Sequence, residues 1–433
     1  MTLSPRPDGE GRSEGAPVPY RERVEDLRDI LVAQGSLGLL LIDTSSLAKI
    51  EREYGTSAYE RVMDMARDLV LELKGHEVRH EDIICLNDRG GDAFLVFFSP
   101  KRREGPLKIA DLKAAADRVE GHLNRKLARL ASPYLGTPRR VTVGFALAFF
   151  NPLVMPERLV SRLVEEAWSC VHVQRAQRDL QNRCDLQDVL LADQLSTVFQ
   201  PIVELRTRQV LGYEALSRGP AGSVYQMPER LFDMAAEADL VFELDRKCRR
   251  RALAAAISLP SPAKLFVNVF PSAMYDPEFQ GAALVRLADD QGLSPDRVVF
   301  EITEKKVIEN YELFAEAVAE LTRFGFSIAI DDVGAGYSGL EKIAHLNPRY
   351  LKFDRELIRN IDSSYIRREM TRALKAFADR IGSTIIAEGI EQEDERRTLL
   401  EIGIQYGQGF LLGRPQAAFL PPALAWPPAA AVS

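Results

Sequence analysis

Short apolar runs alternate with charged segments of helical spacing along the second half of the chain. Between residues 198 and 416 there are eight such runs: VFQPIV, YEAL, KLFVNV, RVVFEI, FSIAID, YLKFD, TIIAEG and YGQGFLLG. A regular alternation of strands and helices is typical of a (β/α)8 barrel. Only ELRTRQVL separates the first two runs, which is too short for the crossover that two parallel strands need. The pattern therefore predicts an α/β fold, a (β/α)8-like (TIM-type) barrel with one antiparallel strand.

The first half of the chain carries a different pattern. Its apolar runs are LGLLLID, DIICL, AFLVFF and VTVGFALAFF, and helical stretches lie around 57–74 and 108–130. These elements predict a smaller α+β domain over residues 21–155, with helices on one face of its sheet. Residues 156–190 have the charged and apolar pattern of a helical linker, with a break near Asp185 as one alternative.

Length and composition agree with two domains and exclude several classes of protein. The chain of 433 residues exceeds what one hydrophobic core usually supports. We expect the barrel domain over 191–420, a disordered leader over 1–20 and a Pro/Ala-rich tail over 421–433. No apolar run reaches the roughly 18 residues of a membrane span, and the start lacks the apolar core of a signal peptide. A cytoplasmic protein without a membrane segment is therefore expected.

Charge and cysteine spacing narrow the range of functions further. A net charge of -7 disfavours a protein that binds polymeric nucleic acid, and we interpret the basic run Arg249–Arg251 as a solvated helix face. The four cysteines are scattered, without the CxxC spacing of a zinc site or the pattern of a disulfide framework.

Polar residues stand at or just after the ends of the predicted barrel strands. They are Glu214, Asn268, Glu301, Asp331, Asp332, Lys352, Glu388 and Gln408. A single Asp after a strand is more often a helix cap or a turn former than a ligand. Barrels of this type, however, carry their catalytic groups on the face formed by the carboxyl ends of the strands. Because so many polar residues share these ends, we expect them to form one site.

The chemistry of this set predicts a metal site. Its carboxylates would repel one another at one barrel mouth unless cations neutralised them, and carboxylate and amide oxygens suit Mg²⁺ or Mn²⁺. Two such ions, about 3.5–4 Å apart, activate a water and stabilise the leaving oxygen of a phosphoester. The adjacent Asp331 and Asp332 would then serve different ions, and Lys352 would orient the water or offset the charge of the phosphate.

Eight motifs resemble those of the EAL-domain family of cyclic di-GMP phosphodiesterases and occur in the order typical of that family. They are FQPIV, EALSRGP, FVNV, FEITE, IDDVGAGYSGL, LKFD, IAEGIE and GQGFLLGRP. The resemblance covers about 190–416 and implies hydrolysis of cyclic di-GMP to linear pGpG with Mg²⁺ or Mn²⁺, by a homodimer. Val333 replaces a Phe that is common in the family and Gly339 a common Ser, which bears on regulation more than on metal ligation.

The resemblance also implies a role for each residue of the site. The residues that would hold the two ions are Glu214, Asn268, Glu301, Asp331 and Asp332, with Asp331 shared between the ions. Lys352 and Gln408 would position the water, and Glu388 would act as general base or support the second ion. Gln200 and Arg218 would contact the substrate, and Glu304 would anchor the loop that carries Asp331 and Asp332.

The first half of the chain resembles a degenerate GGDEF domain, the ferredoxin-like fold of diguanylate cyclases. The signature is GGDAF from Gly90 to Phe94, with Ala93 in place of an acid, and Ser45 stands where a second Asp usually follows Asp43. Because two-metal phosphoryl chemistry tolerates few ligand losses, we expect no cyclase activity.

Other roles of this first domain are left open by its sequence. Glu51 and Glu60 stand where the family often uses Asn and Asp to bind guanine. The residues Arg79–Asp82 have the letters of the inhibitory RxxD motif but lie further from Gly90 than usual. Binding of a guanine nucleotide, as a sensory site, and dimerisation are the two alternatives.

Three functions fit a barrel with these residues: an active phosphodiesterase, a catalytically silent cyclic di-GMP receptor, and a metal-dependent barrel lyase. Receptors that resemble this family commonly lose metal ligands or the signature Glu, which this chain retains as Glu214. A lyase would need a general base at an apolar pocket rather than the phosphate-gripping Arg218. The retained residues favour a phosphodiesterase of bacterial second-messenger signalling.

Overall fold

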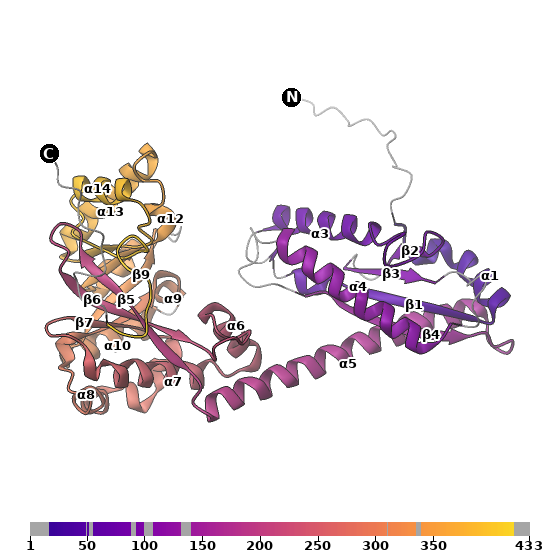
Figure 1. Ribbon diagram of the computed structural model, residues 1–433, viewed down its shortest axis with the longest axis horizontal. Helices are drawn as coiled ribbons and strands as arrows, with labels where there is room; N and C mark the ends of the chain where they lie inside the picture. Colours follow the sequence, from indigo (N-terminus) through magenta and orange to yellow (C-terminus); the bar gives the residue numbers. More distant parts are fainter. Residues whose placement is uncertain are drawn as a thin grey trace. The chain divides into compact units, whose positions relative to one another are not determined.

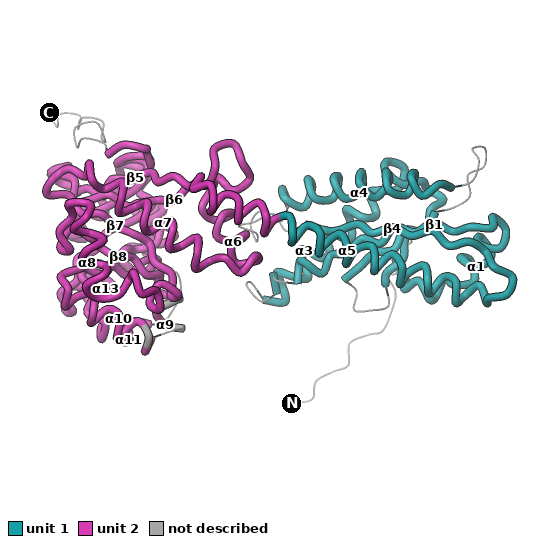
Figure 2. The backbone as a smooth tube through the Cα atoms, turned by 90° about the horizontal axis from the view of Figure 1, so that it is seen from below, with its two compact units in different colours: residues 1–181 teal, residues 182–433 magenta. Residues whose placement is uncertain are grey.

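The computed structural model describes residues 17–48, 50–51, 55–87, 92–98, 107–130, 140–309, 311–334 and 339–419. Contacts divide the chain into two compact units, residues 1–181 and 182–433 (Figure 2). The tail predicted over 421–433 and residues 1–16 of the predicted leader lie outside the described residues. Among the helices of the described part, none combines the length and the apolar character that a bilayer crossing requires.

Unit 1 is built on a four-stranded antiparallel sheet with the order β2-β3-β1-β4 (Figure 1). Its strands are β1 (Ser36–Asp43), β2 (Ile83–Leu86), β3 (Ala93–Phe97) and β4 (Thr142–Phe149). Its helices are α1 (Val24–Gln34), α3 (Thr56–Leu71), α4 (Ile109–Leu130) and the first part of α5 (Pro156–Leu191). Each of the four apolar runs in this half of the sequence forms a strand.

The prediction that helices cover one face of this sheet is wrong, because helices cover both faces. The side chains of Leu40 and Ile42 pack with α3 and α4, whereas Leu39 and Leu41 pack with α1 and α5. Strand β1 is buried from its second residue to its last. A continuous apolar run such as LGLLLID is the sequence signal of a strand that is covered on both faces.

Two further expectations for unit 1 are corrected at its ends. Residues 17–20 are packed rather than disordered, because Pro19 pairs with Leu86 and the ring of Tyr20 is buried in the cluster under α1. Burial of an aromatic ring offsets the entropy lost when the segment is ordered. Helix α5 continues from Pro156 to Leu191 without a break at Asp185.

Unit 2 is a closed barrel to which each of the eight predicted runs contributes a strand. The strands are β5 (Ser196–Glu204), β6 (Val210–Arg218), β7 (Lys264–Asn268), β8 (Val298–Thr303), β9 (Ser327–Val333), β10 (Tyr350–Phe353), β11 (Thr384–Ala387) and β12 (Tyr406–Gly407). Strand β5 runs antiparallel to both of its neighbours, β6 and β12, and the other pairs are parallel. The predicted barrel with one reversed strand is therefore confirmed.

Helices follow the parallel strands and surround the barrel (Figure 1). They are α6 (Pro228–Ala238), α7 (Val241–Ala255), α8 (Gly281–Asp289), α9 (Glu304–Glu309), α10 (Tyr311–Arg323), α11 (Leu340–Leu346), α12 (Arg355–Ile358), α13 (Tyr365–Ile381) and α14 (Glu393–Ile402). The main apolar core of the unit lies between these helices and the strands.

The expectation of a solvated basic face at Arg249–Arg251 is wrong for its first member. Arg249 on α7 is 4% exposed, and its guanidinium donates to Asp245 Oδ2 at 2.8 Å and to Asp276 Oδ2 at 2.9 Å. The reason is the position of the two acids, because a buried guanidinium is stable where carboxylates neutralise it. Arg250, the next residue, is exposed as expected.

A layer of apolar side chains fills the inside of the barrel beneath the predicted site. Its members are Ile202, Phe266, Val299, Ala329, Tyr350 and Ile386. Five of these residues precede a predicted site residue by two positions, at Asn268, Glu301, Asp331, Lys352 and Glu388. Because side chains two apart on a strand lie on the same face, the strands that carry this layer also direct the polar groups to one end of the barrel.

Candidate metal-dependent active site

The ammonium of Lys352 lies at the centre of the predicted site. Its Nζ atom is 2.6 Å from Glu388 Oε1, 2.9 Å from Glu301 Oε1, 3.3 Å from Glu214 Oε2 and 3.4 Å from Asp331 Oδ1. Burial opposes the charge of Lys352, but the four carboxylates hold its pKa well above its usual value. Side chains from five strands or strand ends therefore meet at one point, as the sequence predicts.

The carboxylates form two groups that share one residue. Oxygens of Glu214, Glu301 and Asp331 lie within 4.8 Å of one another, and so do oxygens of Asp331, Asp332 and Glu388. Asp331 belongs to both groups. Such an arrangement fits two divalent cations that share a carboxylate ligand.

A bulge in strand β9 explains how two adjacent acids reach the same site. Ile330 pairs with Leu351 and Val333 pairs with Phe353, so that Asp331 and Asp332 together face Lys352 alone on β10. Adjacent side chains on a regular strand would lie on opposite faces, and an extra residue removes that alternation. Asp332 has a φ of 59°, and its N–H donates to Asp331 Oδ1 at 3.0 Å. This strained backbone was not foreseen from the sequence.

The buried acids of this site outnumber the positive charges that the described residues supply. Burial raises the pKa of Glu301 and of Glu388 well above the usual range. Burial and the charge of Asp331 together raise the pKa of Asp332 to about 6. Neither ordinary water nor the ammonium of Lys352 neutralises so many carboxylates in a buried space. The oxygen-rich donor set fits Mg²⁺ or Mn²⁺.

Amide side chains connect the carboxylates to the antiparallel strand β5. Gln408 Nε2 donates to Glu214 Oε2 at 2.7 Å and to Gln200 Oε1 at 2.9 Å, and Gln200 Nε2 donates to the backbone oxygen of Gly413 at 3.0 Å. Asn268 Nδ2 donates to Glu214 Oε1 at 2.9 Å. These bonds fix the orientation of Glu214, the first residue of the EALSRGP motif.

Two other predicted residues lie at the edges of the site. Arg218 ends strand β6, and its Nη1 donates to the backbone oxygen of Ser217 at 2.8 Å. Glu304 is 1% exposed at the start of α9, and its Oε2 accepts from the N–H of Gly334, which follows the two acids, at 3.3 Å. Residues 335–338 of the predicted loop lie outside the described residues.

The end of strand β1 in unit 1 differs from the barrel site. Asp43 is fully buried and pairs with Arg175 on α5, a contact that the sequence did not indicate. Ala93, the residue that replaces an acid in GGDAF, lies opposite Asp43 on β3. Gly90 and Gly91 of this signature lie outside the described residues.

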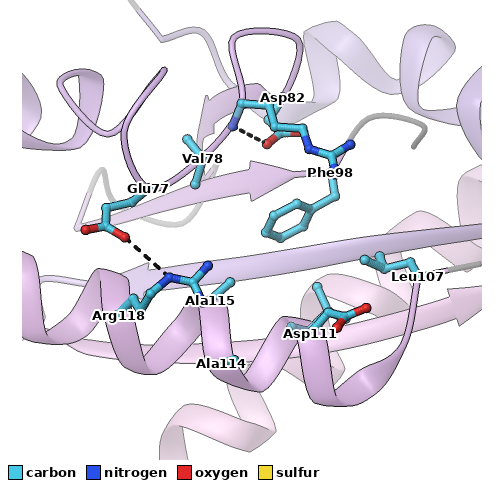
Figure 3. A pocket seen from close by; sticks show the side chains of 11 residues that line it. Glu77, Val78, Asp82, Phe98, Leu107, Asp111, Ala114, Ala115 and Arg118 are labelled. Carbon is cyan, nitrogen blue, oxygen red and sulfur yellow. Dashed lines mark hydrogen bonds and ion pairs between the residues drawn. The ribbon is translucent and has the colours of Figure 1, made fainter. Parts of the chain in front are cut away.

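Unit 1 also contains a cavity of about 260 Å³ between the turn before β2, the end of β3 and α4 (Figure 3). Val78 and Phe98 supply apolar walls, and the predicted RxxD residues Arg79 and Asp82 lie at its edge. The carboxylate of Asp82 accepts from the N–H of Arg79 at 2.7 Å, so these four residues form a tight turn.

An acid cluster at the carboxyl ends of barrel strands defines a class of proteins built to hold divalent cations. Within that class the chain belongs to the EAL domain family, whose model matches residues 183–415. The matched segment contains every predicted residue of the barrel site.

Individual relatives match the chain over different lengths. The "Uncharacterized protein y4lL" of Sinorhizobium fredii (strain NBRC 101917 / NGR234) is 27% identical over 416 residues, 92% of this chain and 48% of y4lL. The "Probable cyclic di-GMP phosphodiesterase PdeA" of Escherichia coli (strain K12) is 29% identical over 221 residues, 50% of this chain and 30% of PdeA. The chain thus spans about half or less of the length of these relatives.

A solved structure shows the same fold. The FimX EAL domain of Xanthomonas citri, crystallised in complex with c-diGMP, is 21% identical and aligns with a TM-score of 0.51 over 57% of this chain and 98% of that domain. At this identity the likeness concerns the fold of the barrel unit.

Proposed function

We propose that the barrel unit is a phosphodiesterase that hydrolyses cyclic di-GMP to linear pGpG with two Mg²⁺ or Mn²⁺ ions. The observation that carries the proposal is the pair of acid groups that share Asp331. The name of the relative PdeA, a probable cyclic di-GMP phosphodiesterase, supports the choice of substrate. In this reaction one water adds across one phosphodiester bond and opens the ring.

The first ion would be held by Glu214, Asn268, Glu301 and Asp331, and the second by Asp331, Asp332 and Glu388. Bound divalent cations lower the pKa of a water and neutralise charge on the phosphate. The grouping of Glu388 with the two aspartates supports its role as a ligand of the second ion over its role as a general base.

Lys352 and Gln408 would hold the attacking water and the phosphate. The ammonium of Lys352 lies among four acids, so it would become available to the water or the phosphate once the two ions neutralise those acids. Gln408 has a buried Oε1 without a hydrogen-bond partner among the described residues, which is a free acceptor for a water proton. Gln200 is engaged with Gln408 and Gly413, so we assign to it the orientation of Gln408 as well as a place beside the substrate.

Arg218 would bind a phosphate of the substrate. In the described part of the chain its guanidinium donates to a backbone oxygen and forms no ion pair, so its charge is available to a ligand. Burial lowers the pKa of Arg218, although the charges of Glu229 and Glu214 oppose that shift. The planar guanidinium can donate two bonds to one phosphate group.

Unit 1 would be a degenerate GGDEF domain without cyclase activity and would act in regulation or dimerisation. The opposition of Ala93 and Asp43 supports the loss of activity, because the second acid of the expected ion site is missing. We expect a homodimer, which light scattering of the full chain tests. Formation of cyclic di-GMP from GTP by the purified chain would contradict the inactive assignment.

Chromatography of the reaction products tests the proposed function. The full chain is incubated with cyclic di-GMP and Mg²⁺ or Mn²⁺, beside Glu214→Ala and beside Glu237→Ala as a control, since Glu237 is exposed on α6. We expect pGpG from the wild type and from Glu237→Ala, and none from Glu214→Ala. Tight binding of cyclic di-GMP without turnover would show a silent receptor instead.

A further inference from the structure

The buried carboxylate at the end of strand β1 is neutralised by a residue of helix α5. Arg175 Nη2 lies 2.5 Å from Asp43 Oδ2 and donates to Ser45 Oγ at 3.0 Å. The other oxygen of Asp43 accepts from the N–H of Ser45 at 2.9 Å. Asp43 Oδ2 thus has an ion pair with Arg175 but accepts no hydrogen bond from the described residues, whereas Oδ1 accepts one.

The neighbours of Asp43 explain why a single arginine suffices. Its partners across the sheet are Ala93 on β3 and Thr142 on β4, and neither side chain carries a charge. The nearby Asp92 is engaged elsewhere, since Tyr59 Oη donates to Asp92 Oδ1 at 2.6 Å. A single buried carboxylate requires one positive charge, whereas a divalent cation requires several oxygen ligands. While Arg175 and Ser45 hold the carboxylate of Asp43, the described residues at this strand end do not fit a divalent cation.

The ion pair also lies at a particular place along α5. The helix packs its apolar side against the sheet of unit 1 from Leu159 to Val171. Between Val171 and Leu186 none of its residues is buried. Over that stretch Arg175 reaches Asp43, and Arg178 reaches Glu120 at 2.8 Å. Charge contacts thus replace apolar contacts at the last turns of α5 that belong to unit 1.

We propose that Arg175 takes the place of a divalent cation at the end of β1 and fastens this stretch of α5 to the sheet. The site is then closed to Mg²⁺ and Mn²⁺, and a cation or a metal-bound nucleotide can enter only by displacing Arg175. Displacement frees the segment 172–185, through which the chain leads into unit 2. The ion pair at the end of β1 would thus determine whether this part of helix α5 stays attached to the sheet, independently of the reaction in the barrel.

Hydrogen exchange of the full chain, read by mass spectrometry on peptides of α5 and β1, tests this proposal. The variant Arg175→Met removes the charge and keeps an unbranched side chain that matches the aliphatic stem of arginine. We expect exchange of residues 172–181 to rise at least about tenfold, while residues 159–171 stay as in the wild type. The control Arg183→Met changes an exposed arginine about two turns further along the same helix and leaves both segments unchanged.

Two further variants keep the test valid if Arg175→Met folds poorly. Arg175→Lys retains a charge and is expected to retain slow exchange of 172–181. Asp43→Asn combined with Arg175→Met removes both charges, so the melting temperature recovers toward that of the wild type while exchange of 172–181 stays fast. Exchange of 172–181 at the wild-type rate in this double variant would overturn the proposal.

Addition of MnCl₂ tests the exclusion of cations. The peptide around Asp43 is expected to show no change in the wild type and slower exchange in Arg175→Met, because the vacated carboxylate then has room for an ion. The readout is local to unit 1, so metal bound in the barrel does not affect it. An equal response to MnCl₂ in both proteins would show that Arg175 does not close the site.

Discussion

Two strand ends in this molecule carry buried carboxylates, and they balance their charge in different ways. At the end of β1 in unit 1, Asp43 faces the guanidinium of Arg175. At the mouth of the barrel, four acids contact the ammonium of Lys352, and Asp332 adds a fifth carboxylate beside Asp331. Buried charges are stable when they are paired, so the first region is complete without an ion. The second has an excess of negative charge that divalent cations would neutralise.

A third site, at Asp276, shows that this charge balance is a property of each site rather than of each unit. Asp276 in unit 2 is fully buried, and it accepts two hydrogen bonds from Arg246 and one from Arg249. It lies in the same unit as the acid cluster but has its positive charge supplied by the protein. A shortage of positive charge, more than the presence of acids, thus distinguishes a metal site from a structural ion pair.

The largest expected effect comes from neutralising one acid of the cluster. Glu301→Gln keeps the shape of a side chain that contacts Lys352 and belongs to the first acid group. We expect turnover of cyclic di-GMP to fall about a thousandfold, since a metal ion contributes several kcal/mol to transition-state stabilisation. Steady-state assays compare it with Glu312→Gln, an exposed position on α10. Equal rates for the two variants would contradict a metal-holding role.

Removal of the Lys352 ammonium should lower the stability of the metal-free protein more than that of the metal-bound protein. Lys352→Met leaves buried acids without their positive charge, which we expect to lower the free energy of unfolding by about 3 kcal/mol or more. Saturating Mn²⁺ should recover most of that loss, because a ligand that binds only the folded state stabilises it. Denaturant unfolding with EDTA and with Mn²⁺ measures the difference. Lys264→Met, a half-buried lysine on β7, serves as the control, and a loss that Mn²⁺ leaves unchanged would refute this explanation.

Asp276, whose charge is neutralised by arginines, should make the stability of the protein depend on pH. Burial opposes its charge, but hydrogen bonds from Arg246 and Arg249 outweigh burial and hold the pKa of Asp276 at about 2, below the ordinary 3.8. A carboxyl with a lowered pKa stabilises the fold above pH 4 and loses that contribution as the pH falls toward 2. The expected loss is about 2 kcal/mol. Unfolding of wild type and Asp276→Asn between pH 5 and 2 checks this, and parallel curves would contradict it.

The smallest effect in the series concerns an arginine that, among the described residues, forms no ion pair. Arg218→Ala should raise KM for cyclic di-GMP about tenfold and change kcat less, because a charged hydrogen bond to a phosphate contributes about 1.5–3 kcal/mol to binding. Arg250→Ala, which removes an exposed arginine paired with Glu278, is the matched control. A fall in kcat at unchanged KM would place Arg218 in the chemical step instead.

Much of the barrel and its site could be predicted from the sequence because both follow local rules. Strands and helices alternate with a regular spacing, and the short segment between β5 and β6 permits only a hairpin. The polar groups could be assigned to one end because they follow the apolar runs by a fixed distance along the chain. Side chains along a strand alternate between its two faces, and this alternation determines which face Glu214, Glu301 and Asp331 occupy.

Other features depend on contacts that the local pattern does not contain. The bulge at Asp331 and Asp332 is a shift of register between two strands, which neither strand shows alone. Arg175 and Asp43 are separated by most of unit 1, so their pairing follows from the tertiary fold. The Asp245 and Arg249 pair, by contrast, has the four-residue spacing of a helical ion pair and could have been recognised.

A titration of the metal-free full chain with Mn²⁺, counted by the electron paramagnetic resonance of the free ion, tests the comparison most directly. We expect two bound ions per chain, both in the barrel, with at least one lost in Glu301→Gln and both bound more weakly in Asp331→Asn. We expect no ion at Asp43 while Arg175 is present. Fewer than two ions, or two ions that survive the change of Asp331, would contradict the shared-carboxylate site.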